Sequence, residues 1–393
     1  MQRRLIVLFA ILAMVMAACT TAADTTTTAG EPGDTTADTT GDTTGDTTGD
    51  TTGDTTETTT TAVRPQAEGG ILAAVQDRGS LICGVNDAVP GFGFATAEGD
   101  FEGFDIDFCK AVAAAVLGDP EAVEYTPLTA QQRFTALQGG EIDVLIRNTT
   151  WTATRDGSEG ATFLTTTFYD GQGMMVKADS GITSIDDMEN ASVCVLSGTT
   201  TELNLATRFN SAGLAYTPQT FEDNETLQSA FEADQCDGWT SDKSQLAGVR
   251  SAWPGGPEEL VILEETFSKE PLGPVGVDGD TQWAQVVDWV VISTILAEEL
   301  GIDSTNVDSF ADTEDAEIRR FLGLEIEDED GNVSTFESGL GLEAGFAAEV
   351  VAAVGNYGEI FDRNIGPDTP LGLERGINAL WTDGGLMYGP PYR

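Results

Sequence analysis

The 393-residue chain has no histidine, and its 18 lysine and arginine residues are outnumbered by 66 aspartates and glutamates. Without histidine it cannot build a Ser-His-Asp or Cys-His nucleophile system, and most kinds of zinc site are excluded too. The formal net charge of -48 argues against nucleic acid as a partner, because phosphate contacts need clustered lysine and arginine. The globular part also lacks the P-loop motif of ATPases. We therefore expect no catalytic residues, no metal and no cofactor.

Long apolar runs are also missing, and the N-terminal run is short. Two arginines precede apolar residues 5–15, and small residues then lead to Cys19. This run is shorter than the roughly 20 residues that span a bilayer, and it predicts a secretory signal peptide at residues 1–18. The segment Met16–Cys19 resembles the lipobox of bacterial lipoproteins, which implies a lipid on Cys19 that anchors the chain to the outer face of the cell membrane. Plain secretion, with Cys19 as an incidental thiol, is the alternative.

After Cys19 the chain consists almost entirely of Thr, Asp, Gly and Ala up to residue 65. A segment of this composition has no apolar side chains to bury, so it cannot offset its ordering entropy and is expected to be disordered. We interpret residues 19–65 as a lipidated cysteine followed by a tether. Residues 66–393 are long enough for two lobes with cores of their own.

Strand and helix patterns alternate along residues 66–393, which predicts an α/β fold with mainly parallel sheets. Strands are expected at residues 81–85, 141–146, 192–196 and 236–240. Helices are expected at residues 104–116, 131–137, 200–209, 226–233 and 282–300.

The alternating pattern is interrupted near residues 169–175 and 269–275. The simplest arrangement is a first lobe (66–172) interrupted by a second lobe (173–271) and completed by residues 272–393, which include a C-terminal helical extension. Two crossing strands would then form a hinge.

The segment Cys194–Leu205 reads as a strand that stops at a glycine, passes three threonines and enters a helix. Thr199 and Glu202 have the spacing of a capping box, which defines the helix start. The free N–H groups and the positive end of the helix dipole are available to an anion. Because no lysine follows the glycine, a nucleotide phosphate is not expected there.

The segment Gly103–Val116, GFDIDFCKAVAAAV, resembles the signature of the family 3 extracellular solute-binding proteins, the polar amino acid receptors of ABC importers. Further segments resemble the general L-amino-acid receptors of that family. They include PLTAQQRFTALQGGEIDVLIRNTTWT, VCVLSGTTTELNLA, SKEPLGP and VGNYGEIFDRNIG. The resemblance implies a two-lobed fold of the type II periplasmic-binding-protein kind, with a hinge and extra C-terminal helices.

The resemblance also implies a site for the two charged ends of an amino acid. Arg155 stands where the family's arginine holds the α-carboxylate, and a guanidinium can pair two parallel N–H groups with two carboxylate oxygens. Asp242 stands where a carboxylate receives the α-ammonium, and Thr150 and Asn148 match positions that complete the site. The alternatives are a surface position for Arg155 and a helix N-cap for Asp242.

The second lobe would contribute the helix start, with Thr200 and Thr201 as contacts to the same carboxylate. In the side-chain pocket the chain has Asn86 where small receptors have an aspartate, and Val89 and Ala130 where some have an aromatic ring. These differences predict a roomier and less selective pocket. Aromatic residues that either refill it or belong to the core are Phe92, Phe94 and Trp151.

Four cysteines remain after Cys19, and in an exported chain we expect them to be oxidised. Four cysteines allow three pairings. A bridge between the lobes would prevent closure, so we predict Cys83 with Cys109 in the first lobe and Cys194 with Cys236 in the second.

The predicted function is that of a receptor that captures free L-amino acids and delivers them to the permease subunits of an ABC transporter. We expect a monomer that is attached to the membrane by its N-terminal lipid. One alternative is a dehydratase-type enzyme on the same fold, with Glu141, Glu202 or Asp242 as acid or base. Another is a sensory or adhesive surface lipoprotein without tight ligand binding.

Overall fold

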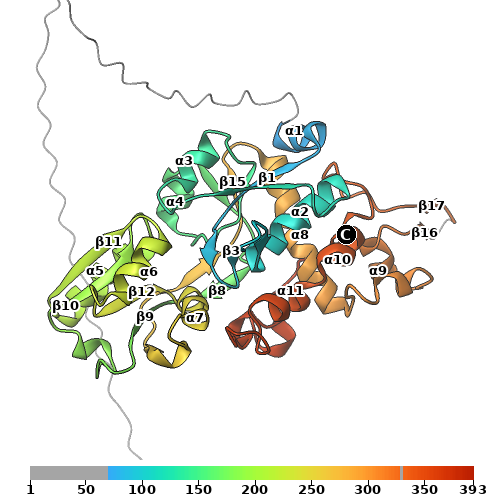
Figure 1. Cartoon of the computed structure of the whole chain (residues 1–393). Coiled ribbons are helices and arrows are strands. Elements are labelled where there is room, and N and C mark those ends of the chain that lie inside the picture. Colours follow the sequence, from blue (N-terminus) through green and yellow to red (C-terminus); the bar gives the residue numbers. More distant parts are fainter. Residues whose placement is uncertain (1–69, 328–330) are drawn as a thin grey trace, which may run out of the picture. The chain divides into compact units, whose positions relative to one another are not determined.

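The computed structural model describes residues 70–327 and 331–393. The predicted signal peptide, Cys19 and the tether lie outside the described residues. The described part contains two five-stranded sheets, each covered by helices, and we call each sheet with its helices a lobe (Figure 1).

The sheet of the first lobe has the strand order β5-β1-β6-β15-β7. Strand β1 runs parallel to β5 and β6, whereas β15 is antiparallel to the central strand β6 and to β7. The strands are β1 (Leu81–Val85), β5 (Val123–Pro127), β6 (Val144–Leu145), β7 (Ala161–Phe163) and β15 (Val275–Val277).

The sheet of the second lobe has the order β11-β10-β12-β9-β13 and comes from one continuous part of the chain. Strand β10 is parallel to β11 and β12, and β9 is antiparallel to β12 and β13. The strands are β9 (Gln172–Lys177), β10 (Ala191–Leu196), β11 (Tyr216–Phe221), β12 (Gly238–Asp242) and β13 (Leu260–Ile262).

The expectation of mainly parallel sheets is therefore wrong, because half of the strand pairings in each sheet are antiparallel. The chain reaches β9 and β15 directly from a crossing strand. Only a parallel pairing of consecutive strands requires a long crossover, usually a helix, so these two strands are free to pair in the antiparallel sense.

The crossing strands are β8 (Phe168–Asp170) and β14 (Glu270–Leu272), which pair antiparallel in a two-stranded sheet. Strand β8 leads from the first sheet into β9, and β14 leads back from the second sheet to β15. The α/β lobes are therefore joined by a pair of strands, as expected for a hinge.

The first lobe has the larger core, which is built around helix α2 (Phe104–Leu117) and the long buried helix α8 (Thr281–Leu300). Helices α10 (Phe346–Val354) and α11 (Tyr357–Asn364) pack on these two, as Figure 1 shows. Asp288 is a polar residue of this apolar helix α8, and its Oδ1 accepts hydrogen bonds from the Thr165 N–H and hydroxyl. None of the helices that the structure describes is long and apolar enough to cross a membrane.

The remaining elements are short or cover the sheets. They are α1 (Gly70–Arg78), β2 (Ala88–Val89), β3 (Gly93–Ala95), β4 (Phe101–Glu102), α3 (Arg133–Gln138), α4 (Ala153–Ser158), η1 (Ile185–Asp187), α5 (Thr200–Ala212), α6 (Asn224–Glu232), α7 (Lys243–Ser251), η2 (Pro257–Glu259), η3 (Val307–Phe310), α9 (Ala316–Phe321), β16 (Ile326–Glu327), β17 (Val333–Ser334), η4 (Gly376–Asn378) and η5 (Trp381–Asp383).

The glycine that opens the family-like segment is required by the backbone. Gly103 has φ of 129°, and a Cβ atom there would lie 2.3 Å from the Phe92 carbonyl oxygen. Only glycine combines this conformation with this close approach. Helix α2 therefore starts directly against the turn between β2 and β3 that carries Phe92.

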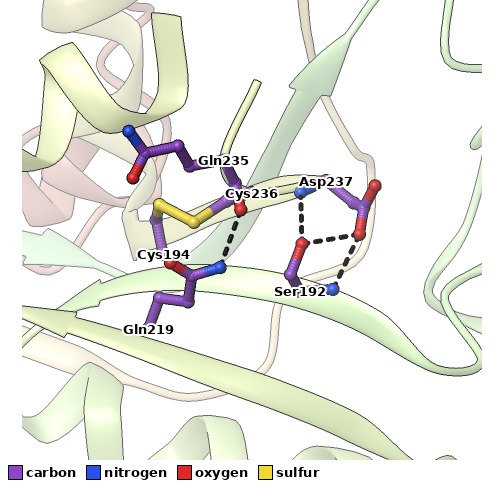
Figure 2. The surroundings of a disulfide bond; sticks show 6 residues. All are labelled: Ser192, Cys194, Gln219, Gln235, Cys236 and Asp237. Atoms are coloured by element: carbon purple, nitrogen blue, oxygen red, sulfur yellow. Dashed lines mark hydrogen bonds between the residues drawn. A yellow bond between two sulfur atoms is a disulfide. The ribbon is translucent and has the colours of Figure 1, made fainter. Parts of the chain in front are cut away.

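Two disulfides link Cys83 to Cys109 and Cys194 to Cys236, which are the pairs predicted from the sequence. Each bridge stays within one lobe, so neither restrains movement between the lobes. Figure 2 shows the second bridge beside the hydrogen bonds that join Ser192 to Asp237, which hold β10 against the segment before β12.

Candidate functional site

The candidate site forms where the parallel strands of both sheets end. In the first lobe, Asn148 and Thr150 follow β6. In the second lobe, Thr200 follows β10, and Asp242 is the last residue of β12. The carboxyl ends of parallel strands commonly form binding crevices because loops and helix starts meet there. Residues from both lobes surround a cavity of about 20 Å³ at this place, which we call the inner cavity.

Three arginines of the first lobe line the inner cavity: Arg133 in α3, Arg147 after β6 and Arg155 in α4. Their side chains are nearly completely buried. The Phe134 ring lies 5.3 Å from the Arg133 guanidinium carbon and 5.6 Å from that of Arg155. Such cation–π contacts stabilise guanidinium groups that have lost water. The first lobe thus presents concentrated positive charge to the cavity.

Arg155 is fixed by its own helix and by both lobes. Its backbone N–H donates to Thr152 Oγ1, the N-cap of α4, at 3.2 Å. Its Nη1 donates to the Thr150 carbonyl at 3.0 Å, and its Nη2 donates to the Gly198 carbonyl of the second lobe at 3.5 Å. Burial lowers the pKa of Arg155, while Glu270 and Asp242 oppose that change. The guanidinium is therefore oriented before any ligand binds.

Asp242 faces these arginines from the second lobe. It is 5% exposed, and its Oδ1 is buried without a hydrogen-bond partner. Burial raises the pKa of Asp242, together with Asp170 and Glu270, whereas Arg155 and Arg133 lower it. A buried carboxylate oxygen without a donor is costly, so this atom is available to a donor supplied by a ligand.

Asp242 occupies the N-cap position of α7, yet its side chain makes no capping hydrogen bond. The N–H of Ser244 in the first turn of α7 donates instead to Asp170 Oδ2, at 3.1 Å. Because the crossing strand β8 supplies this carboxylate, the Asp242 carboxylate is not used to start the helix.

Glu270 of the crossing strand β14 is a further buried carboxylate at the site, with an exposed fraction of 1%. Its Oε2 accepts from Thr200 Oγ1 at 2.8 Å, and its Oε1 accepts from Asn204 Nδ2 at 2.8 Å. The Thr200 hydroxyl proton is therefore already engaged. The side chain of Thr201 instead contacts the Thr199 hydroxyl, at 2.9 Å.

The start of helix α5 differs in one detail from the predicted capping box. Thr199 Oγ1 accepts from the Glu202 N–H at 3.1 Å, as a capping box requires. The Glu202 carboxylate, however, accepts from the Gly198 N–H at 3.0 Å rather than from the N-cap residue. The tight turn at Gly198, with φ of 72°, brings that N–H within reach.

Asn148 lies between the two lobes in a left-handed backbone conformation with φ of 32°. Its N–H donates to Asp105 Oδ2 at 2.7 Å, and its Oδ1 accepts from Asn86 Nδ2 at 3.1 Å. Its Nδ2 lies 3.5 Å from Gln245 Oε1 in the second lobe. Burial raises the pKa of Asp105 to about 7, against the lowering effects of the Asn148 N–H and of Arg147.

The structure brings most of the sequence-predicted residues to the inner cavity. Those that line it are Asn148, Thr150, Arg155, Thr200, Thr201 and Asp242.

Asn86 instead lines a larger neighbouring cavity of about 260 Å³, which we call the outer cavity. Val89, Ala130 and Phe92 are buried and line neither cavity. Trp151 is 43% exposed and stacks on Phe163.

Sequence reasoning missed two of the three arginines, Arg133 and Arg147, and also Gln245. Arg133 stands in the predicted helix 131–137 and Arg147 directly follows the predicted strand 141–146. The available signal was that basic residues are scarce, so three arginines within residues 133–155 are a local excess in a strongly acidic chain.

Two α/β lobes joined by paired strands, with oppositely charged residues facing one cavity between them, define a bilobal binding protein. The model of the bacterial extracellular solute-binding proteins, family 3, matches residues 81–340, and the chain belongs to this family. Residues 341–393, which include α10 and α11, extend beyond the matched part.

Similar proteins cover nearly the whole described part. The general L-amino acid-binding periplasmic protein AapJ of Rhizobium johnstonii is 48% identical over 322 residues, 82% of this chain and 92% of that protein. The glutamate/glutamine/aspartate/asparagine-binding protein BztA of Rhodobacter capsulatus is 47% identical over 83% of this chain and 94% of its own length. A periplasmic binding protein of an ABC transporter from Brucella ovis, solved with glutathione bound, is 46% identical with a TM-score of 0.78, covering 82% of this chain and 99% of that chain.

Proposed function

We propose that the chain is the substrate-binding component of an ABC importer, which captures free L-amino acids between its lobes and delivers them to membrane permease subunits. The observation that carries this proposal is that Arg155 and Asp242 line the inner cavity from opposite lobes. The guanidinium would hold the α-carboxylate, and the unpartnered Asp242 Oδ1 would accept from the α-ammonium.

Capture requires movement. The inner cavity of about 20 Å³ has room for roughly one water molecule, so an amino acid enters only when the lobes separate or the lining side chains shift. Closure around the ligand would then let each lobe contribute one charged partner. The lobe bounds that we propose are 66–172 with 272–393 for the first lobe, and 173–271 for the second.

The relatives support the ligand class. Their names describe binding of L-amino acids, or of glutamate, glutamine, aspartate and asparagine, and the Brucella ovis protein held glutathione. The residues proposed to contact the ligand are Arg155, Asp242, Thr150, Asn148, Thr200, Thr201 and Asn86.

We further propose export by a signal peptide at residues 1–18 and anchoring by lipid on Cys19, with residues 19–65 as the tether and a monomeric body. The support is the lipobox-like sequence before Cys19. A body held near the outer face of the membrane meets its permease without being lost by diffusion.

The test is a thermal-shift panel of the twenty amino acids, with glutathione added, on protein stripped of bound ligand. A ligand at 100 times its dissociation constant adds about 2.7 kcal/mol of stability, which gives a clear shift. A shift with one or more amino acids is expected. If none of the amino acids shifts the transition, the sensory or adhesive alternative replaces this proposal.

The same samples separate a receptor from an enzyme. A receptor releases its ligand unchanged, whereas a dehydratase-type enzyme using Glu141, Glu202 or Asp242 would convert it. Mass spectrometry of the ligand after long incubation is expected to return only the starting amino acid, and a new product would overturn the receptor assignment.

A further inference from the structure

The inner cavity holds more positive charge than one amino acid backbone needs. A single α-carboxylate is satisfied by one guanidinium, and Arg155 is the residue oriented for it. Arg133 and Arg147 line the same cavity and are 3% and 5% exposed. A buried charge is retained only when something compensates it, so these two side chains require an explanation.

Arg147 has no direct ionic partner in the described part of the chain. Its Nε donates to the Leu128 carbonyl at 2.7 Å, and no carboxylate oxygen of a described residue lies within 4.0 Å of its guanidinium. Burial lowers the pKa of Arg147 to about 10, with Asp87, Asp105 and Asp242 opposing and Arg155 reinforcing that change. These carboxylates act on Arg147 from a distance, since none of the described ones forms a direct ion pair with it.

Arg133 gives an independent sign of a missing partner. Its Nε is completely buried and has no hydrogen-bond partner, while its Nη2 reaches the Gly198 carbonyl only at 3.4 Å. Repulsion from Arg155 and Arg147 adds to burial in lowering the pKa of Arg133. An unsatisfied buried donor is costly, and a ligand oxygen would remove that cost.

The position of Arg147 indicates which part of a ligand it meets. It lines both the inner and the outer cavity, together with Leu196, so it stands where the two connect. The outer cavity of about 260 Å³ exceeds the roughly 150 Å³ that holds a benzene molecule in an apolar cavity. The far end of a ligand side chain that leaves the inner cavity therefore passes Arg147.

We propose that Arg147, with Arg133 beside it, forms a second anion subsite, and that the preferred ligands are amino acids with a second carboxylate at the end of the side chain. The inference rests on the proposed function and deepens it by naming the ligand class. The outer cavity itself is bordered by the acidic residues Asp87, Glu222, Asp223 and Glu225. The second carboxylate is therefore placed at Arg147 and not farther out.

The experiment is calorimetric titration of the stripped protein with L-glutamate and with L-glutamine, which differ only in the charge of the distal group. A hydrogen bond to a charged partner contributes more than one to a neutral group, so L-glutamate is expected to bind about tenfold or more tightly. Equal affinities, or tighter binding of L-glutamine, would overturn the second anion subsite. Absence of binding by every amino acid would instead reject the proposed function.

Variants connect this preference to Arg147. In Arg147→Gln the preference for L-glutamate over L-glutamine is expected to disappear, and in Arg147→Lys, which keeps the charge without the planar fork, part of it should remain. Arg250→Gln, which removes an exposed arginine of α7, is the matched control and should keep the full preference. If Arg147→Gln kept the full preference for L-glutamate over L-glutamine, the assignment of Arg147 to the second anion subsite would be overturned. The thermal transition of each variant serves to show that it is folded.

Discussion

Arg155 is the residue on which we expect capture of an amino acid to depend most. Its guanidinium is buried, donates to the carbonyl groups of Thr150 and Gly198, and faces the cavity shared by both lobes. Arg155→Ala is expected to weaken amino acid binding by about 100-fold or more, because the α-carboxylate loses a charge-assisted bidentate partner. Titration calorimetry with the tightest ligand of the panel measures the loss.

The matched control is Thr201→Ala on the other side of the cavity. The hydroxyl of Thr201 contacts Thr199, and the substitution leaves the backbone N–H in place. We expect binding to weaken by only about threefold. If Arg155→Ala bound amino acids normally, the assignment of the α-carboxylate to Arg155 and to the start of helix α5 would be contradicted.

Asp105 provides a pH-dependent prediction. Burial raises its pKa from the ordinary value of 3.8 to about 7 in the folded protein. The folded state then binds more protons than the unfolded state between these two values, so stability falls as pH rises through this window. From pH 5 to pH 8 this group alone should remove about 3 kcal/mol from the free energy of unfolding.

In Asp105→Asn this pH dependence should be missing. Chemical denaturation at pH 5 and pH 8 is expected to show a loss of stability that is smaller than in the wild type by about 3 kcal/mol. Asp77→Asn, which removes the charge of an exposed aspartate on α1, is expected to behave like the wild type. An unchanged pH dependence in Asp105→Asn would show that Asp105 ionises normally.

At the scale of single residues, motifs in the sequence predict only part of the candidate site. Arg155 and Asp242 stand at recognisable positions, and both line the cavity. Arg133 lies in an ordinary amphipathic helix and Arg147 follows an ordinary strand, so the local sequence around each does not indicate a binding residue. What distinguishes them is that the fold buries both beside Arg155 without an ionic partner among the described residues, which depends on tertiary contacts.

Among the elements, the crossing strand β8 is held by the C-terminal extension. The Tyr169 N–H donates to Asn378 Oδ1 at 2.7 Å, and Asn378 Nδ2 donates to the Tyr169 carbonyl at 3.1 Å. The Tyr357 hydroxyl donates to the Thr167 carbonyl at 2.8 Å. The extension thus attaches β8 to the first lobe, and we expect any hinge movement to begin after this attached part of the strand.

Asn378→Ala should therefore loosen the hinge strand. The substitution leaves the Tyr169 N–H and carbonyl without their side-chain partners, and we expect a loss of about 1 to 3 kcal/mol in the free energy of unfolding. Hydrogen exchange at the Tyr169 amide should accelerate. The control Asn210→Ala, at an exposed position of α5, should change neither quantity. Unchanged exchange at Tyr169 in Asn378→Ala would contradict the attachment.

The helices and strands that hydrophobic periodicity predicts are present in both lobes, with ends shifted by a few residues, whereas β5, β9 and β11 were not predicted. The helix expected at residues 282–300 is α8 (Thr281–Leu300), and that expected at 104–116 is α2 (Phe104–Leu117). The antiparallel strands β15 and β13 were not predicted. Strands of three residues contain too few alternations to show a period, and the direction of β15 follows from the crossing strand β14 before it.

For the whole molecule, the two disulfides and the paired crossing strands fit a receptor whose lobes move as units. Each disulfide joins two segments of one lobe, β1 to α2 in the first lobe and β10 to the segment before β12 in the second. The chain has a net charge of -48 and few basic residues, and three of these basic residues line the inner cavity. The acidic surface keeps such a protein soluble, whereas the cavity reverses the sign of the charge locally.

The central claim is that the cavity recognises a zwitterion, with its carboxylate on Arg155 and its ammonium on Asp242. The most direct test is calorimetric titration with the tightest amino acid of the panel and two analogues, its α-hydroxy acid, which lacks the ammonium, and its α-amide, which lacks the carboxylate. Each analogue leaves one buried charge unpaired, so each should bind about 100-fold or more weakly than the amino acid. If either analogue bound as tightly as the amino acid, the assignment of the corresponding charged residue would be contradicted.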